Sequence, residues 1–407
     1  MDDAAWLAEV TARGARHGTA PVCVHRTPMF LNAAEAARWR RVLPPVHRLL
    51  RKVRAALLAD LDRGADSLAA RLGTPLDAIS WAQIDPGFPD VAPLARLDAY
   101  AVDGQPFFLE LNAENPAGMG YASVLGPLFA AEHPGRLFLD PVPHVIRTVR
   151  ALAREWGVAR HRFNIVIVDL PGVATAPEFD VLASAFRAAG HPTVVATPDE
   201  LSFDGQALRA GDLPVDVLYR RFLVRDLRAH PEALGPVLAA YRARRVCMVN
   251  SLRTCLLHNK AIFALLHDPS FPLSPGERRL VSRHFPLTLL VSPGNRERLR
   301  RERERWVLKP VDAHGGQGVV LGWLATEAEW EEALSRPVAQ VAQARVPAPI
   351  GRFHDARTGR EAPRVVDLGP FLARGKLAGF LCRLAEGELA NVSAGKATMV
   401  PVLEARR

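Results

Sequence analysis

The chain has 407 residues, of which 49% are hydrophobic, and its formal net charge is +9. This length is too great for one ordinary hydrophobic core and predicts two or three domains. No stretch approaches the roughly 18 uninterrupted apolar residues of a membrane span, and the chain starts with acids where a signal peptide carries positive charge. We therefore expect a cytoplasmic protein without a membrane partner, whose four cysteines, lacking CxxC spacing, are reduced thiols in packed positions.

The basic residues are mostly scattered along the chain. The one dense run, at 296–306, alternates acids with bases at helical spacing and predicts a solvated helix face. We therefore expect no nucleic-acid partner, although a basic nucleic-acid-binding protein is kept as an alternative. In a chain that uses arginine for almost every cation, each retained lysine is a candidate for a role that needs a compact point charge. The five lysines are Lys52, Lys260, Lys309, Lys376 and Lys396.

In chain order, residues 32–72 predict amphipathic helices that are interrupted at Pro44-Pro45. A two-strand pattern follows at 94–102 and 106–113. Residues 161–250 then alternate strand and helix, which predicts a small doubly wound α/β unit with a mainly parallel sheet.

The rest of the chain, from residue 255 onward, predicts an α+β lobe. A helix comes first, and the strand-like segments after it indicate antiparallel sheets, with 336–352 as a candidate linker or hinge. We expect three domains: residues 1–140 with the N-terminal helices and the two-strand pattern, residues 141–250 as a Rossmann-like unit, and residues 251–407 as the last lobe.

The two-strand pattern is a candidate polar site. With a three-residue loop at 103–105, Asp98 lies opposite Glu110 and Arg96 lies opposite Asn112 on one face of the hairpin. A two-residue loop would instead put Asp98 and Glu110 on opposite faces. The core anchors expected on the other face are Phe107, Leu109 and Leu111.

Oxygen donors of this kind fit a hard cation. Mg²⁺ binds through one or two carboxylates and completes its shell with water and phosphates, and Arg96 would present a bidentate fork to a phosphoryl group. The metal ligands expected are Asp98, Glu110 and Asn112. A solvated polar face on an ordinary hairpin is the alternative.

A glycine-rich turn follows the expected strand 306–310, which carries Lys309. Gly315, Gly316 and Gly318 leave no Cβ atoms to block a phosphate, and successive backbone N–H groups can form an anion-binding nest. The motif is neither a Walker loop nor GxGxxG. Taken alone, the same letters also fit a plain hairpin turn.

Taken together, Arg96-Leu97-Asp98, "LELNAENP", "NKAIFALL" and "VLKPVDAHGGQGV" resemble the circularly permuted ATP-grasp enzymes. The resemblance extends over about residues 90–400, in particular to the synthetase domain of glutathionylspermidine synthase and its uncharacterised relatives. In ordinary ATP-grasp proteins the glycine loop precedes the metal strands, whereas here it follows them. The fold class implied is α/β and α+β, a circularly permuted ATP-grasp core with a small doubly wound (pre-ATP-grasp-like) domain.

The resemblance also implies roles for single residues. It implies Mg²⁺ at Asp98, Glu110 and Asn112, ATP phosphates at Lys260, Lys309 and the glycine loop, and a phosphoryl contact from Arg96. The backbone of Gln343 would face the adenine. Arg383 and Asn391 of the closing strands would reach the site, whereas a role for Lys396 there stays open.

The function implied is an ADP-forming carboxylate–amine ligase that acts through an acyl phosphate. Its partners would be a small-molecule or peptide acid and an amine, whose identities stay open, as does the oligomeric state. Arg220 and Arg221 are candidates for holding the acid, against a role as surface salt bridges. Glu114 and Asn115 would support the metal ligands or contact substrate. A non-catalytic ATP-binding partner or regulatory protein is the main alternative.

Overall fold

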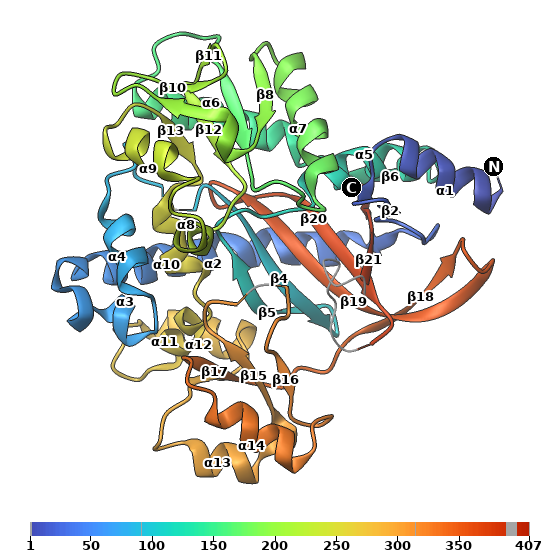
Figure 1. Ribbon diagram of the computed structural model, residues 1–407. Coiled ribbons are helices and arrows are strands. Elements are labelled where there is room, and N and C mark those ends of the chain that lie inside the picture. Colours follow the sequence, from blue (N-terminus) through green and yellow to red (C-terminus); the bar gives the residue numbers. More distant parts are fainter. Residues whose placement is uncertain (1, 91, 314, 388–396, 407) are drawn as a thin grey trace.

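The structure is a computed structural model that describes residues 2–90, 92–313, 315–387 and 397–406. Within these residues, a six-stranded antiparallel sheet lies at the centre (Figure 1). Its order is β21 (Ala397–Val400), β20 (Lys376–Ala385), β19 (Arg360–Ala373), β4 (Leu94–Val102) and β5 (Gln105–Asn112), with β18 (Ile350–Asp355) beside β19. Segments far apart in sequence therefore share one sheet.

Helix α2 (Ala33–Leu58) packs against this sheet and crosses behind it in Figure 1. The Trp39 ring meets Phe108 and Phe380 edge-on, with centroid separations of 6.2 and 5.6 Å. Aromatic contacts of this geometry stabilise a core beyond the area they bury. One face of the sheet is thus apolar, which leaves the other face for polar side chains.

The interruption expected at Pro44 and Pro45 is wrong, because α2 continues through both residues. Pro44 is exposed and Pro45 is half-buried. The carbonyls that lose their helical partners are those of Arg40 and Arg41, near the solvent side where water can satisfy them. The buried stripe of the helix supplies the packing that outweighs the two missing hydrogen bonds.

A four-stranded parallel sheet confirms the doubly wound α/β unit. Its order is β13 (Cys247–Val249), β12 (Val217–Arg220), β7 (Ile165–Val168) and β8 (Thr193–Ala196). The helices of this unit are α6 (Val142–Trp156), α7 (Ala176–Ala188) and α9 (Gly235–Arg242). A small antiparallel sheet that the sequence did not predict joins β9 (Leu201–Phe203), β10 (Leu208–Ala210) and β11 (Leu213–Pro214).

A four-stranded antiparallel sheet forms the small lobe at the bottom of Figure 1. Its order is β14 (Thr288–Leu290), β17 (Gln340–Ala344), β15 (Trp306–Pro310) and β16 (Val320–Leu321), with α13 (Arg296–Arg301) and α14 (Glu327–Ser335) beside it. Strand β15 has the bounds expected from the sequence. The linker expected at 336–352 is only partly right, because β17 and the start of β18 fall inside it.

The structure contains further helices and short strands. They are α1 (Asp3–Ala12), β1 (Arg16–His17), β2 (Ala20–Pro21), β3 (Met29–Leu31), η1 (Leu61–Asp66), α3 (Leu68–Arg71), α4 (Leu76–Gln83), α5 (Met119–Glu132), β6 (Arg136–Phe138), η2 (Pro198–Glu200), α8 (Val224–Ala229), η3 (Leu252–Thr254), α10 (Cys255–His258), α11 (Ala261–His267), α12 (Pro275–His284), η4 (Arg303–Arg305) and β22 (Val402–Ala405). The four cysteines are buried free thiols, as expected. In the part of the chain that is described, no helix combines the length and apolarity needed to cross a bilayer.

The hairpin of β4 and β5 turns at two residues, not at the three residues expected. Val102 pairs with Gln105, and the turn residues Asp103 and Gly104 have φ values of 51° and 70°. Two positive φ angles are typical of the type I′ turns that match the twist of a hairpin.

A β-bulge nevertheless keeps the expected pairing. Ala99 pairs with Phe108, whereas Asp98 pairs with Glu110, so Leu109 is the extra residue of β5. A bulge of this kind changes the face on which the following side chains lie. It therefore restores Asp98 and Glu110 to one face despite the shorter turn.

The bulge also changes which residues anchor the strand. Arg96 pairs with Asn112 as expected. Phe108 and Leu111 are buried in the core, whereas Phe107 is half-buried and Leu109 lines the cavity described below. The expected core positions of Phe107 and Leu109 are therefore wrong.

We predict that Gly104→Ala lowers the free energy of unfolding by about 1–2 kcal/mol, because a left-handed conformation costs a residue with a Cβ roughly that much. A Cβ at this position would also lie 2.6 Å from Nη1 of Arg38. Gly235→Ala, where no heavy atom lies within 4 Å of the added Cβ, is the control. Equal midpoints of chemical unfolding for the two variants would contradict the turn assignment.

Candidate active site

A cavity of about 630 Å³ is lined by residues of the six-stranded sheet, of the small-lobe sheet and of the loops that follow the parallel strands. The polar face of β4 and β5, with β19 and β20, forms its middle. The glycine loop with β15 and β17 forms one end, and the loops that follow β7 and β12 form the other. The cavity is thus bounded by segments from all three expected domains.

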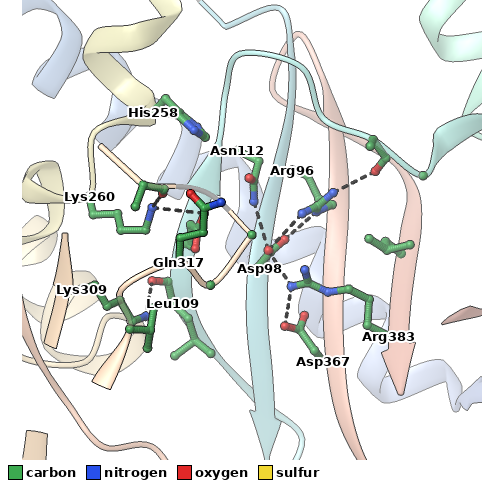
Figure 2. A pocket seen from close by; sticks show the side chains of 18 of the residues that line it. Arg96, Asp98, Leu109, Asn112, His258, Lys260, Lys309, Gln317, Asp367 and Arg383 are labelled. Carbon is green, nitrogen blue, oxygen red and sulfur yellow. Dashed lines mark hydrogen bonds and ion pairs between the residues drawn. The ribbon is translucent and has the colours of Figure 1, made fainter. Parts of the chain in front are cut away.

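Asp98 lies at the centre of this face (Figure 2). Arg96 donates to both carboxylate oxygens, from Nε to Oδ1 at 2.6 Å and from Nη2 to Oδ2 at 3.1 Å. Asn112 Nδ2 and Arg383 Nη2 donate to Oδ2 at 3.0 and 2.6 Å. Burial favours the neutral acid, but the guanidinium charges of Arg383 and Arg96 outweigh it and hold the pKa of Asp98 well below its usual range.

Arg383 connects this cluster to a second carboxylate, that of Asp367 on β19. Arg383 Nη2 donates to Asp367 Oδ2 at 2.6 Å, and the two residues are paired across β19 and β20. Burial raises the pKa of Asp367 to about 6, although Arg383 opposes that shift. Sequence reasoning placed Arg383 near the site but missed Asp367.

The two lysines expected to contact a nucleotide lie together on the other side of Glu110. Nζ of Lys260 is 3.5 Å from Glu110 Oε1 and donates to the carbonyl of Ala313. Nζ of Lys309 donates to Gln343 Oε1 at 2.7 Å and to the carbonyl of Leu109 at 3.4 Å. Lys260 is therefore a buried residue of the cavity rather than a surface lysine.

Burial sets the proton affinity of these groups. It lowers the pKa of Lys309 to about 8, although the carboxylate of Glu110 opposes that shift. At Glu110 burial raises the pKa, but the charges of Lys260 and Lys309 together outweigh it, so the net shift is downward. The end of the cavity next to the glycine loop thus carries two cationic side chains against one carboxylate at neutral pH.

The glycine loop bends back toward Lys260, as Figure 2 shows for Gln317. Gly315, Gly316 and Gly318 have φ values of 61°, 74° and 70°, which side chains with a Cβ rarely adopt. Gly315, Gly316 and Gln317 line the cavity. The backbone of this loop therefore requires glycine at these three positions, and its anion-binding role stays a prediction.

The segment after β5 is fixed from several sides. Asn250 Nδ2 donates to the carbonyls of Ala113 and Glu114 at 2.8 and 3.1 Å. Glu114 Oε2 accepts from Arg220 Nη1 at 2.8 Å and from the backbone N–H of Val224 at 2.7 Å. We call residues 113–120 the strap, because they connect the β4–β5 hairpin to α5 and include its first two residues.

This geometry corrects two expectations. Arg220 is 1% exposed and donates five hydrogen bonds, to one carboxylate, three carbonyls and one hydroxyl. It is therefore neither a surface salt bridge nor free to hold an acid. Glu114 Oε2 is likewise occupied by Arg220 and by the backbone N–H of Val224, so Glu114 supports the strap rather than contacting substrate.

Asn115 and Arg221, the other two residues expected near the substrate, line the cavity. Asn115 donates to the carbonyl of Arg221, and Nη2 of Arg221 lies 3.3 Å from Glu178 Oε2. Glu178 Oε1 accepts from the backbone N–H groups of Gly118 and Gly120 at 2.7 and 3.0 Å. A buried ion pair thus fixes the far end of the strap.

Four functional candidates were missed from the sequence: Asp169, Glu178, His258 and Asp367. Asp169 and Asp367 each interrupt or end an apolar strand, "IVIVDL" and "RVVDLG", which is the signal that could have found them. His258 precedes Lys260 by two residues and lines the cavity. Asn391, which was expected at the site, lies outside the described residues, as does Lys396.

A model of one protein family matches residues 98–393, most of the chain. The chain belongs to the circularly permuted ATP-grasp type 2 family. This match confirms the resemblance inferred from the hairpin, Lys260 and the glycine loop. The order of motifs, with the hairpin before the glycine loop, is the permuted order in the chain itself.

The ATP-grasp relatives are distant. "Putative glutamate–cysteine ligase 2-3" of Frankia alni is 29% identical over 237 residues, 54% of this chain and 27% of that relative. Uncharacterized protein Rv2411c of Mycobacterium tuberculosis is 28% identical over 283 residues, 65% of this chain and 50% of that relative. The chain therefore spans a half or less of these relatives.

A solved structure shares the fold. The glutathione synthetase-like effector GSS30 of Globodera pallida, in its apo form, matches with a TM-score of 0.62 and 11% identity. The match covers 98% of this chain and 95% of that one. At this identity the likeness establishes the fold alone.

The ATP-grasp cavity offers oxygen donors for Mg²⁺. Among the described residues no three His, Cys, Asp or Glu side chains are grouped to hold a metal without other ligands. Glu110 and the Oδ1 of Asn112 fit an ion that takes the rest of its shell from water and phosphates. Asp98 already accepts four hydrogen bonds, and Oδ1 of Asp367 is buried without a partner in the described structure.

We predict that Glu114→Ala lowers the free energy of unfolding by about 3–5 kcal/mol, because it leaves the buried Arg220 charge without its carboxylate. Glu361→Ala, which removes an exposed partner of Arg352, should change it by less than about 1 kcal/mol. Chemical unfolding followed by circular dichroism measures both. A small effect of Glu114→Ala would mean that the buried pair does not hold the strap.

Proposed function

We propose that the protein is an ATP-dependent carboxylate–amine ligase that forms an amide and releases ADP and phosphate. The observation that carries this is one cavity in which two lysines, with Glu110 beside them, and a glycine loop lie across from Arg96 and Arg383 (Figure 2). Family membership and the name of the Frankia relative support the same reaction class.

The reaction balances in two steps. A substrate carboxylate oxygen attacks the γ-phosphorus of ATP, the bond to the bridging oxygen breaks, and ADP leaves. The amine nitrogen then attacks the acyl carbon, the C–O bond to phosphate breaks with its electron pair, and the amine loses a proton. Neither step needs a protein nucleophile, so positioning and charge stabilisation carry the catalysis.

Arg96 and Arg383 would stabilise the transferred phosphoryl group. Both guanidiniums are held by Asp98, so they keep their orientation without substrate. A preorganised positive charge stabilises a transition state without a reorganisation cost at the moment of reaction. Arg96 also donates to the strap carbonyl of Ala117 at 2.8 Å, which fixes its far side.

The nucleotide would lie at the end formed by Lys260, Lys309 and the glycine loop. Mg²⁺ held by Glu110 and Asn112 would neutralise phosphate charge there. The glycine loop would close over the phosphates and exclude water, which would otherwise hydrolyse the acyl phosphate. The contact expected between the backbone of Gln343 and the adenine stays a prediction. The side chain of Gln343 accepts a hydrogen bond from Lys309.

We predict that Glu110→Gln abolishes ADP formation and leaves the fold intact, because the amide keeps the size of the carboxylate but loses the charge that faces Lys260. The assay measures ADP with ATP, Mg²⁺ and pooled amino acids, peptides and polyamines, and hydroxylamine is added to trap acyl phosphate as hydroxamate. Circular dichroism checks the fold.

The matched control is Glu361→Gln, an exposed carboxylate on β19. It should retain the wild-type rate. Near-normal turnover in Glu110→Gln would remove this carboxylate from the mechanism. A wild-type protein that binds Mg-ATP but forms no ADP with any pool would instead indicate a non-catalytic ATP-binding protein.

We predict that affinity for Mg-ADP falls as the pH rises through about 8 and above. Lys309 has a pKa of about 8 in the free protein, so its ammonium is charged below that pH and neutral above it. Bound phosphate favours the charged form, which extends the fall to higher pH. Calorimetric titrations from pH 6.5 to 9.5 measure it, and Lys309→Arg, which stays charged, should flatten the profile. A wild-type affinity that is constant over this range would contradict the assignment.

A further inference from the structure

The end of the cavity farthest from the glycine loop has no role in the proposed phosphoryl transfer. It is built at the carboxyl ends of β7 and β12, where Asp169 and Arg221 follow the two strands directly. In open parallel sheets this edge is where ligands commonly bind. Asp226, in the first turn of α8, lines the same end.

The charges at this end do not balance. Arg221 is committed to Glu178, at 3.3 Å, and is 2% exposed. Asp169 accepts the backbone N–H of Leu170 at 2.8 Å, and Asp226 accepts that of Leu223 at 2.7 Å. In the described part of the chain neither aspartate has a salt-bridge partner. The charge of Arg221 acts on Asp169, but Arg221 is also paired with Glu178, so Arg221, Glu178, Asp169 and Asp226 together leave this end of the cavity with a net negative charge.

These aspartates are close enough to influence each other. Burial raises the pKa of Asp169 to about 6, and the charge of Asp226 adds to that shift, whereas the charges of Arg221 and Arg220 oppose it. A half-buried carboxylate that is destabilised in this way gains free energy when a cation binds beside it. His17 and Tyr121 also line the cavity at this end. Burial lowers the pKa of His17 and raises the pKa of Tyr121, so neither adds charge near neutral pH.

The middle of the cavity differs in its charge. There the charges of Arg96 and Arg383 balance those of Asp98 and Asp367. In the proposed reaction the two arginines would bind the substrate carboxylate that is converted to an acyl phosphate. The small lobe, the large sheet and the parallel sheet follow one another from bottom to top in Figure 1. The cavity therefore runs from a cationic end through a balanced middle to an anionic end.

We propose that Asp169 and Asp226 bind the amine substrate as a primary ammonium ion at the parallel-sheet end of the cavity. This inference rests on the proposed ligase activity for the use of the site, but the binding itself does not require turnover. The ligand class is a small molecule with a primary ammonium group, as in an amino-acid derivative or a diamine.

The strap would set the distance from this end to the acid. Its carbonyl at Ala117 meets Arg96, and its N–H groups at Gly118 and Gly120 meet Glu178, the partner of Arg221. Both contacts are buried or partly buried. An ammonium held at Asp169 is thereby kept in register with an acid held at the Arg96 side.

Binding is tested first without turnover. Calorimetry with glycinamide and with 1,4-diaminobutane, in the presence of Mg²⁺ and a non-hydrolysable ATP analogue, measures the two sources of the ammonium separately. We expect one or both to bind, and we expect N-acetylglycinamide, which has no ammonium, not to bind. Absence of binding by both amines overturns the proposal whatever the activity of the protein.

Variants then locate the binding. Asp169→Asn and Asp226→Asn keep an oxygen for the backbone N–H that each residue accepts, so the fold should be unchanged. Each should weaken ammonium binding at least tenfold and leave the affinity for Mg-ADP within twofold. Asp199→Asn, on the exposed turn η2, is the control and should change neither. Unchanged ammonium affinity in both cavity variants overturns the assignment.

Activity provides a separate readout. With hydroxylamine, which attacks acyl phosphates as a neutral nucleophile, Asp169→Asn should form hydroxamate at nearly the wild-type rate. With an ammonium substrate its KM should rise at least tenfold, with a smaller change in kcat. Equal losses with both nucleophiles contradict a role in ammonium recognition. Failure of the wild-type protein to form hydroxamate contradicts the ligase proposal alone, because the calorimetric result stands without it.

Discussion

The carboxylate of Asp98 is the group on which the polar face of the central sheet depends. A buried carboxylate is costly unless it is paired and hydrogen-bonded, and here donors arrive from β4, β5 and β20. Asp367 on β19 extends the same network through Arg383. Two carboxylates and two guanidiniums therefore neutralise one another across the three strands β4, β19 and β20, and both arginines still face the cavity.

A second set of buried ion pairs joins this sheet to the parallel sheet. The pairs of Arg220 with Glu114 and of Arg221 with Glu178 hold the strap at both of its ends. Consecutive arginines at the end of β12 thus serve different purposes, since one is fully enclosed and the other lines the cavity. Breaking a buried pair is far more costly than breaking an exposed one, which makes this junction rigid.

Much of the fold could be predicted from local patterns. Apolar runs gave the strands around Ile167 and Leu308, and strand alternation placed Asp98 and Glu110 on one face. The reason behind that placement was wrong, because the turn has two residues and a bulge at Leu109 compensates. The bulge depends on Phe108 packing against Trp39 and Phe285, contacts between distant segments that no local pattern contains.

The site was predicted where motifs are continuous and missed where it is assembled from separated positions. The glycine loop and the lysines were found because spacing and residue type suffice there. Asp367 was missed because its role arises only when β19 brings it to Arg383. For Arg220, residue type suggested a ligand contact, and only the burial of its five donors reveals the structural role.

The permuted order of the chain has a consequence for its synthesis. Strand β4 pairs on one side with its hairpin partner and on the other with β19, where Arg96 is matched to Phe371. A ribosome releases the hairpin long before β19, so the nascent chain carries an unpaired strand edge and unpaired acidic and basic groups while the parallel sheet and the small lobe are made. Such non-local pairing slows folding and leaves edges open to wrong partners. The arrangement that brings the polar face together thus makes the central sheet one of the last parts of the molecule to close.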